Sequence, residues 1–314
     1  MNIKNMKGTI YIIISCILYA GSGILIRFVN KELTLFSQIY YRVIISLIIT
    51  LIFVLITHKK LSFERKDLHL FILSAGIGYV AMITFFSIGI LNTTIGNTYW
   101  LLYTTPLFVI LLSRLFFKEK LQSKYIIAFI ILAAGMYLLF KPALNNTYGD
   151  IAAIASAVCY AVYIMINKQL SKKYDAGESL LYTLGLSVLL LTLSIPFFHN
   201  QISLSFGLGT GLFIVLFGVN NFIATYLLNL GLKYTSAQNA SILLVFEPIF
   251  SIVYSWLFFG EKLTLIYYVG FALIFFAVYI SSQNCNIHMK LESKKNHQYR
   301  TYTLKVNNKN SVIK

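Results

Sequence analysis

Charged side chains are scarce in this sequence of 314 residues, where Asp, Glu, Lys and Arg together make up only 11%. A soluble domain carries about a quarter charged residues. Hydrophobic residues account for 58% of the chain, and its mean hydropathy is +0.75. One buried core cannot hold so many apolar side chains, so the composition excludes an ordinary soluble protein and predicts a chain embedded in lipid.

Cysteine, histidine and proline are also few. The three cysteines (Cys16, Cys159 and Cys285) form no CxxC pair, which excludes a disulfide framework and favours small buried packing residues. The five histidines are scattered, so we expect no metal site. Four prolines and 18 glycines exclude a collagen-like or linker-like chain.

Motifs of membrane-embedded enzymes are missing as well. The chain contains neither HExxH nor GxSxG, and it has no nucleotide-binding P-loop. We therefore expect no enzymatic activity, no cofactor and no ATP drive within this chain. A channel would need rings of charge or a filter loop, and neither is evident.

Acidic residues are outnumbered, with 10 Asp and Glu against 26 Lys and Arg and a net charge of +16. In a soluble protein this excess would indicate nucleic-acid binding, but here the basic residues fall mainly in short loops and the C-terminal tail. The predicted outer loops carry only Lys31, Lys141 and Lys262. This asymmetry predicts that both termini are cytoplasmic, which requires an even number of spans. We expect no nucleic-acid partner.

Apolar runs of roughly 20 residues predict the transmembrane helices. Ten such runs occur: 8–28, 35–57, 68–91, 94–117, 122–140, 149–169, 178–198, 207–232, 236–259 and 263–282. The fold class predicted is an all-α integral membrane protein. Short loops and the lack of a targeting extension favour the cytoplasmic membrane of a bacterium or archaeon, with the protein as a monomer or a homodimer.

The second half of the chain repeats the first. A shift of 142 residues makes 14 of the 29 positions from 97 to 125 identical. It superposes, among others, Asn97 on Asn239, Pro106 on Pro248 and Glu119 on Glu261. A shift of 141 pairs Gly8 with Gly149 and Tyr19-Ala20 with Tyr160-Ala161. Two unrelated apolar segments would not be expected to share Asn, Pro and Glu at one constant shift, so we infer that the unit is duplicated.

Each repeat holds five predicted helices, an odd number, so the second repeat enters the membrane from the opposite side. We therefore predict two inverted five-helix repeats, 1–140 and 141–282. Inverted repeats are typical of secondary transporters, because two similar halves can rock around a site near the midplane. Residues 283–314 form a basic stretch with one acid, Glu292, and we expect a disordered cytoplasmic tail near anionic lipid.

Two motifs resemble the EamA-type transporters of the drug/metabolite transporter superfamily. Each repeat has a proline in its fourth helix (Pro106, Pro248) and then an apolar run into Phe117-Lys118-Glu119 or Phe259-Gly260-Glu261. Tyr41-Arg42 is similar to the arginine of the family's second helix. The resemblance covers about residues 8–282. It implies a secondary transporter that moves a metabolite, amino acid or drug-like solute, mostly by export.

Glu247 is the first candidate site residue, because an ionisable group deep in a span is costly and usually functional. It fits a bound solute cation, a coupled proton, or a structural hydrogen bond near the kink expected at Pro248. Pro106 is the matching kink. Arg42 fits either a structural anchor that snorkels or the partner of a carboxylate. Glu119 and Glu261 fit helix-end capping and loop ion pairs better than solute contact.

Other candidates are polar or aromatic residues on helix faces. Asn97 and Asn239 fit hydrogen bonds between helices or contact with a solute. Trp100 and Tyr103 fit core packing or an aromatic wall. Asn221, Thr225 and Asn229 form a polar stripe that lipid would not tolerate, so the stripe faces protein or a water-filled cavity.

Two alternatives to an exporter stay open. The first is an importer or antiporter of a nucleotide-like or phosphorylated metabolite, although such cargo needs several buried cations and only Arg42 qualifies clearly. Neutral, zwitterionic, aromatic or cationic solutes fit better. The second alternative is a membrane scaffold or receptor that transports nothing. Direction and energy coupling cannot be read from the sequence, and protons are a candidate coupling ion.

Overall fold

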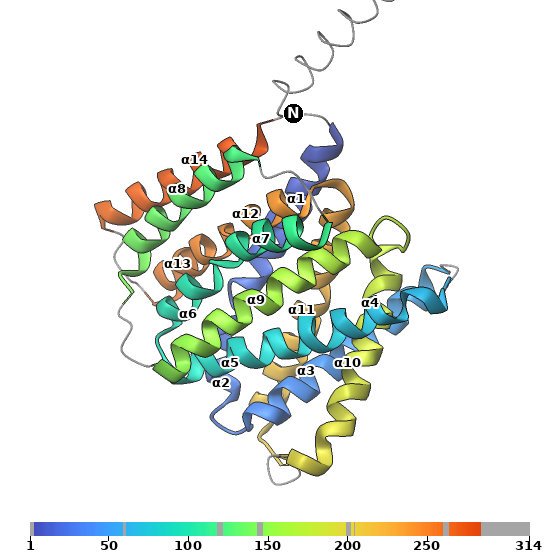
Figure 1. Ribbon diagram of the computed structural model, residues 1–314. Helices are drawn as coiled ribbons and strands as arrows, with labels where there is room; N and C mark the ends of the chain where they lie inside the picture. The colour runs from blue at the N-terminus through green and yellow to red at the C-terminus, as the bar shows by residue number, and fades with distance from the viewer. Residues whose placement is uncertain are drawn as a thin grey trace, which may run out of the picture. The chain divides into compact units, whose positions relative to one another are not determined.

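Ten helical segments in the computed structural model are long and apolar enough to cross a membrane. The structure describes residues 3–58, 61–117, 122–142, 147–198, 202–203, 205–259 and 264–283, and every regular element in these ranges is helical (Figure 1). The all-α fold with ten spans is therefore confirmed. Residues 284–314 of the predicted tail, Glu119 and Glu261 lie outside the described residues.

Helices of the first predicted repeat run from residue 3 to residue 140. They are α1 (Ile3–Tyr19), α2 (Ser22–Val29), α3 (Leu35–Ile56), η1 (Arg65–Asp67), α4 (Leu68–Leu73), η2 (Ser74–Ala81), α5 (Met82–Asn92), α6 (Ile95–Leu102), α7 (Thr105–Phe117) and α8 (Ser123–Phe140). Here η1 is a 3-10 turn and η2 is a π-helix.

The second predicted repeat has fewer interruptions. Its helices are α9 (Thr147–Leu170), α10 (Ala176–Phe198), α11 (Leu208–Tyr234), α12 (Ala237–Leu243), α13 (Phe246–Phe259) and α14 (Leu265–Ser282). Most ends agree with the predicted spans to within about three residues. The differences that matter lie inside the spans, where four of the predicted single helices are interrupted or change their winding.

The first span breaks between α1 and α2, at Ala20 and Gly21. A break inside a membrane frees backbone carbonyls, and each needs a partner from the protein. Three side chains supply them. Asn220 Nδ2 donates to Leu18 O at 2.9 Å, Ser251 Oγ to Ala20 O at 2.8 Å and Tyr254 OH to Ile17 O at 2.9 Å. The break is therefore held by α11 and α13.

The fourth and ninth spans break just before their prolines. Pro106 lies in the first turn of α7 and Pro248 in the first turn of α13, where the missing N–H of proline costs nothing. Thr105 Oγ1 donates to Leu102 O at the first break. Cys16 Sγ lies 3.6 Å from Leu243 O at the second break.

Equivalent caps begin the two broken spans. Thr94 accepts a hydrogen bond from the backbone N of Asn97 at 3.0 Å, and Ser236 accepts one from the backbone N of Asn239 at 3.2 Å. Such caps satisfy amides that the first helical turn leaves unpaired. Thr94 and Ser236 are related by the same shift of 142 residues, so the duplication extends to the helix starts.

The first helix of each repeat packs against the third helix of the other. Gly8 of α1 meets Gly231 and Tyr234 of α11, while Gly149 of α9 meets Asn92 and Thr93 at the end of α5. Figure 1 shows α9 lying along α5. Because these glycines have no side chain, the backbones approach closely in both places. Each repeat therefore packs its first helix against the other repeat, and side chains of both repeats form one hydrophobic core.

The glycine contacts carry a stability prediction. A Cβ at Gly149 would lie 3.0 Å from the backbone carbon of Asn92, whereas a Cβ at Gly185 of α10 meets nothing within 4 Å. Gly149→Leu should therefore overpack the α9–α5 contact and lower the free energy of unfolding by about 1–3 kcal/mol. Thermal unfolding in detergent measures the change, with Gly185→Leu as the control; equal midpoints for the two variants would contradict the packing model.

Candidate functional site

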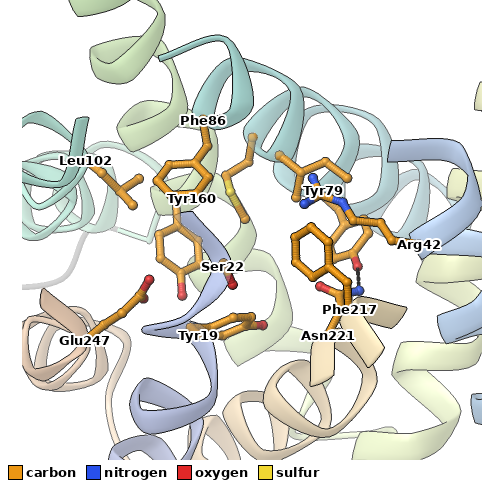
Figure 2. Close-up of a pocket in the computed structure, with 12 residues that line it drawn as sticks. Tyr19, Ser22, Arg42, Tyr79, Phe86, Leu102, Tyr160, Phe217, Asn221 and Glu247 are labelled. Carbon is orange, nitrogen blue, oxygen red and sulfur yellow. Dashed lines mark hydrogen bonds between the residues drawn. The ribbon is translucent and has the colours of Figure 1, made fainter. Parts of the chain in front are cut away.

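A cavity of about 50 Å³ lies where helices of both predicted repeats meet. At about 10–15 Å³ per water position, it holds only a few water molecules. Side chains from α1, α2, α3, η2, α5, α6, α9, α11 and α13 line it. They are Tyr19, Ser22, Arg42, Tyr79, Met82, Ile83, Phe86, Leu102, Tyr160, Phe217, Asn221 and Glu247 (Figure 2).

Glu247 lies on one side of this cavity, in the first turn of α13. Its side chain is buried, with 5% of its surface exposed. Tyr103 OH donates to Glu247 Oε2 at 2.5 Å. Because Glu247 belongs to the first turn of α13, the helix dipole favours negative charge at this position. The site can therefore hold a carboxylate, and that carboxylate can accept a cationic group.

Arg42 lies on the opposite side of the cavity, as Figure 2 shows. Its side chain on α3 is 3% exposed and lies over the ring of Phe217, 4.7 Å from the ring centre. Nη2 donates to Ser87 Oγ at 3.5 Å, while Nε has no hydrogen-bond partner. No salt bridge to Arg42 occurs among the described residues, so its charge is available to an anionic group.

Tyrosines from both repeats lie between these two charged residues. Tyr19 and Tyr160 are equivalent at a shift of 141 residues, and both line the cavity. Tyr79 and Asn221 are equivalent at a shift of 142, and Asn221 Nδ2 donates to Tyr79 OH at 2.5 Å. The two repeats thus meet through matching positions, and the cavity wall is rich in aromatic rings that suit a cationic or aromatic ligand.

Four of the predicted site residues gather around this cavity. Glu247 and Asn221 line it. Tyr103 is not part of the described lining, but its hydroxyl donates a hydrogen bond to Glu247. Thr225 lies one contact away, with its Oγ1 2.6 Å from Tyr19 OH. The polar stripe on α11 therefore faces the interior of the protein at these positions.

The remaining candidates lie elsewhere. Asn97 Nδ2 donates to Thr93 Oγ1, and Asn239 Nδ2 donates to Thr235 Oγ1, at the N-terminal ends of α6 and α12. Trp100 is half-buried and packs against the core. Asn229 Oδ1 accepts a hydrogen bond from Tyr163 OH at 3.1 Å. None of these four side chains contributes to the described lining of the cavity.

The cavity brings Arg42, which the sequence left open between a structural anchor and the partner of a carboxylate, together with lining residues that the sequence had not indicated, notably Tyr19 and Tyr160. Signals for them existed. Arg42 is a charged residue inside an apolar run, which is unusual in a span. Tyr19 and Tyr160 occur at matching positions of the two repeats, and a polar aromatic residue kept twice in this chain is a candidate for the interface between the repeats.

A family model describing EamA-like transporters matches residues 6–141 and again residues 147–283. The chain belongs to the EamA-like transporter family. This confirms the resemblance seen in the motifs, and it makes the protein one of a family of multi-pass membrane transporters.

Curated relatives of this EamA-like protein are transporters too. It is 32% identical over 192 residues to an "uncharacterized transporter" of Archaeoglobus fulgidus, covering 60% of this chain and 68% of the relative. It is 25% identical to the "uncharacterized transporter YoaV" of Bacillus subtilis, covering 77% and 85%. The "pseudopaline exporter CntI" of Pseudomonas aeruginosa is 21% identical, covering 81% and 88%.

A solved crystal structure of another protein has the same fold. It superposes with a TM-score of 0.74 at 18% sequence identity, covering 88% of this chain and 97% of the other. At this identity the likeness shows the fold alone.

The bond between Tyr103 and Glu247 carries a prediction for the EamA-like protein. Tyr103→Phe removes the donor and leaves a buried carboxyl group without it, which should lower the free energy of unfolding by about 1–3 kcal/mol. Tyr160→Phe is the matched control, because it removes a buried hydroxyl from the same cavity without breaking that bond. Chemical unfolding in detergent measures both, and a larger loss in Tyr160→Phe would contradict the assignment.

Proposed function

We propose that this protein is a secondary carrier that exports a small zwitterionic solute by alternating access. The observation that carries the proposal is the pair of buried ionisable side chains, Glu247 and Arg42, on opposite sides of one cavity. A solute that brings a cationic group to Glu247 and an anionic group to Arg42 compensates both at once. Buried charges are costly unless they are paired, so pairing both side chains makes the binding of such a solute favourable.

The lining also argues against other classes of cargo. Arg42 is the one cationic side chain among the described lining residues, whereas a nucleotide or phosphorylated metabolite carries several negative charges. The aromatic lining, with Tyr19, Tyr160 and Phe86, provides ring faces for a solute cation. An amine with a single carboxylate therefore fits the cavity better than a phosphate ester.

Contacts at the helix ends support alternating access. Arg27 at the end of α2 donates to Thr93 O at 3.1 Å, and Gly149 at the start of α9 packs against Thr93. The end of the first span and the start of the sixth thus meet, as expected when the two repeats run in opposite directions. Two inverted halves around a central cavity can open it to either side in turn.

The direction of transport is proposed from a relative and from the charge pattern. One relative is named as an exporter, and the basic loops predict that both termini of this chain are cytoplasmic. We propose that the solute enters from the cytoplasm and leaves on the outer side, and that Glu247 also accepts the proton of a coupled exchange.

The solute class is tested in proteoliposomes with three forms of one labelled amino acid. The amide lacks the negative charge of the amino acid, and the N-acetyl derivative lacks its positive charge. Wild-type protein should move the zwitterion at least about tenfold faster than either derivative, because each loses one charge partner worth about 1.4 kcal/mol or more. Equal rates for the three forms would reject the proposed class.

The role of each charged side chain is tested by neutral variants of similar shape. Glu247→Gln should reduce transport of the zwitterion strongly and remove its dependence on pH, since the variant has no proton to exchange at this position. Arg42→Gln should reduce transport of the zwitterion and spare the amide, which has no carboxylate to pair. Ser194→Ala on α10, outside the described lining of the cavity, is the control. A Glu247→Gln protein with the rate and pH profile of the wild type would exclude Glu247 from the mechanism.

A further inference from the structure

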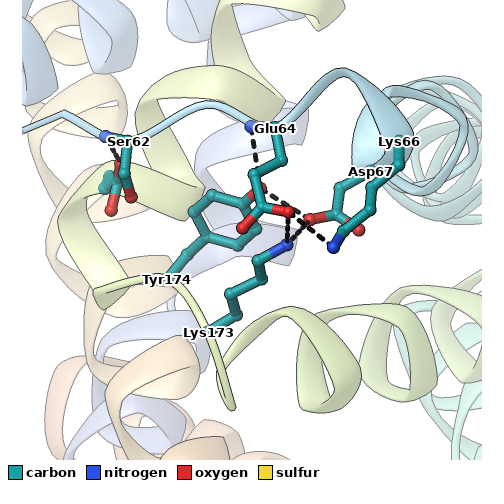
Figure 3. Close-up of polar contacts among 7 residues, drawn as sticks. Ser62, Glu64, Lys66, Asp67, Lys173 and Tyr174 are labelled. Carbon is teal, nitrogen blue, oxygen red and sulfur yellow. Dashed lines mark hydrogen bonds and ion pairs between the residues drawn. The ribbon is translucent and has the colours of Figure 1, made fainter.

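Two clusters of polar contacts join the predicted repeats at opposite ends of α3. The ionic cluster, beyond the C-terminal end of α3, consists of Ser62, Glu64, Lys66, Asp67, Lys173, Tyr174 and Glu178 (Figure 3). The hydroxyl cluster, at the N-terminal end, consists of Glu32, Thr34, Ser37, Tyr41, Ser203 and Gly207. The two ends of α3, a helix of 22 residues, are about 33 Å apart.

Carboxylates hold the ionic cluster together. Lys173 Nζ lies 2.6 Å from Asp67 Oδ2 and 2.5 Å from Glu64 Oε2, and Tyr174 OH donates to Asp67 Oδ2 at 2.7 Å. Nearby, Glu178 Oε1 accepts hydrogen bonds from the backbone N and the Oγ of Ser62. The loop after α3 is thus fastened to the loop between α9 and α10.

In the hydroxyl cluster, at the N-terminal end of α3, most of the contacts are made by hydroxyl groups. The backbone N of Ser203 donates to Ser37 Oγ at 2.7 Å, and Tyr41 OH donates to Ser203 O at 2.8 Å. One carboxylate takes part, because the backbone N of Gly207 donates to Glu32 Oε2 at 2.7 Å. No salt bridge occurs among the described residues of this cluster.

The two clusters share one hydrogen bond between equivalent positions. At a shift of 141 residues, Ser62 corresponds to Ser203 and Ser37 corresponds to Glu178. In both clusters, the backbone amide of that serine donates to the side chain at the other position. The duplication therefore built one contact at each end, and later substitution made the acceptor a carboxylate at one end and a hydroxyl at the other.

The ionic cluster should be the harder of the two to open. Hydrogen bonds with an ionised partner are roughly twice as strong as those between neutral groups. Solvent weakens exposed pairs, but Asp67 is only 14% exposed and Lys173 33%. Hydrogen bonds from Lys173 and then Lys66 hold the pKa of the Glu64 carboxyl below its usual range. Burial lowers the pKa of Lys173, yet its bonds to Asp67 and Glu64 raise it overall.

We infer that these clusters are two equivalent gates of unequal strength, so that without solute the protein stays closed at the ionic cluster and opens first at the hydroxyl cluster. This inference rests on the proposed carrier function. The basic loops predict that the ionic cluster faces the cytoplasm. The resting protein would then be closed to the cytoplasm, and opening of the ionic cluster would be the step that admits the solute.

Distances between spin labels test the inference in nanodiscs without any solute. In a background without native cysteines, one label pair on Leu61→Cys and Lys172→Cys reports the ionic end. Another pair on Lys31→Cys and Gly209→Cys reports the hydroxyl end, where a side chain at Gly209 meets nothing within 4 Å. Wild type should show a short distance at the ionic end and a larger share of long distances at the hydroxyl end.

Neutralising Lys173 should reverse this preference. Lys173→Met should raise the share of long distances at the ionic end at least about threefold and lower it at the hydroxyl end. Its control is Arg65→Met, which removes an exposed cation of the same loop that takes part in none of the ion pairs of the cluster. High ionic strength should move the wild type in the same direction and leave Lys173→Met unchanged. Longer distances at the ionic end alone, without the opposite change, would mean a loosened loop and would overturn the inference.

Exchanging the acceptors gives an independent test. Glu178→Ser copies the hydroxyl acceptor into the ionic cluster, and Ser37→Glu copies the carboxylate into the hydroxyl cluster. The first should favour opening at the ionic end and the second should oppose opening at the hydroxyl end. No shift with either variant, while the labels still report exchange between two states, rejects the unequal gates and leaves the carrier function standing. A single fixed distance at both ends, even with transported solute, rejects the carrier function as well.

Discussion

Lipid offers no hydrogen bonds, and this constraint decides where every irregular feature of the protein lies. A helix that breaks inside a bilayer must find partners for its free carbonyls within the protein. The break after α1 is satisfied by side chains of α11 and α13, and the break before α13 lies beside α1. The broken helices are therefore forced against one another. The interface they form is also the place where buried Glu247 and Arg42 are tolerated.

Most of the fold could be predicted from the sequence, because spans depend on local hydropathy and duplication on matching residues. The candidate site was harder to predict, because the sequence does not show which other helices pack against a given helix face. Glu247 stood out as a deep carboxyl group, whereas Arg42 fitted a structural anchor better than the partner of a carboxylate until Phe217 and the cavity were seen beside it. Asn97 and Asn239 both follow a capping hydroxyl at a helix start, and Asn239 Oδ1 also accepts a hydrogen bond from Ser281 of α14, which is the contact between helices that the sequence allowed.

Equivalent positions of the two repeats have kept a similar place in the fold, but several of them now carry different side chains. Equivalent positions meet across the interface, as Tyr79 and Asn221 do. Other equivalent positions differ in their chemistry. Thr105 donates a hydrogen bond to a backbone carbonyl, whereas the equivalent residue of the second repeat is Glu247, which accepts one from Tyr103. The proposed carrier needs two states of similar energy, and duplicated halves would provide them. It also needs a site with defined polarity, which requires that the copies differ.

The π-helix η2 has a consequence for how the third span is read and altered. Its turns are wider than those of an α-helix, so residues before and after it do not continue one face. Gly78 inside η2 packs against Tyr163, whereas Gly89 in α5 packs against Thr98 and Ala153. A π-turn accommodates one residue more than an α-turn, so deleting one residue between Ser74 and Ala81 would restore ordinary winding and leave the flanking segments in their relative orientation, whereas the same deletion inside α5 would turn its two parts by about 100°. The eight residues of η2 are thus the place where the third span can lose a residue while the side chains of α5 keep their direction.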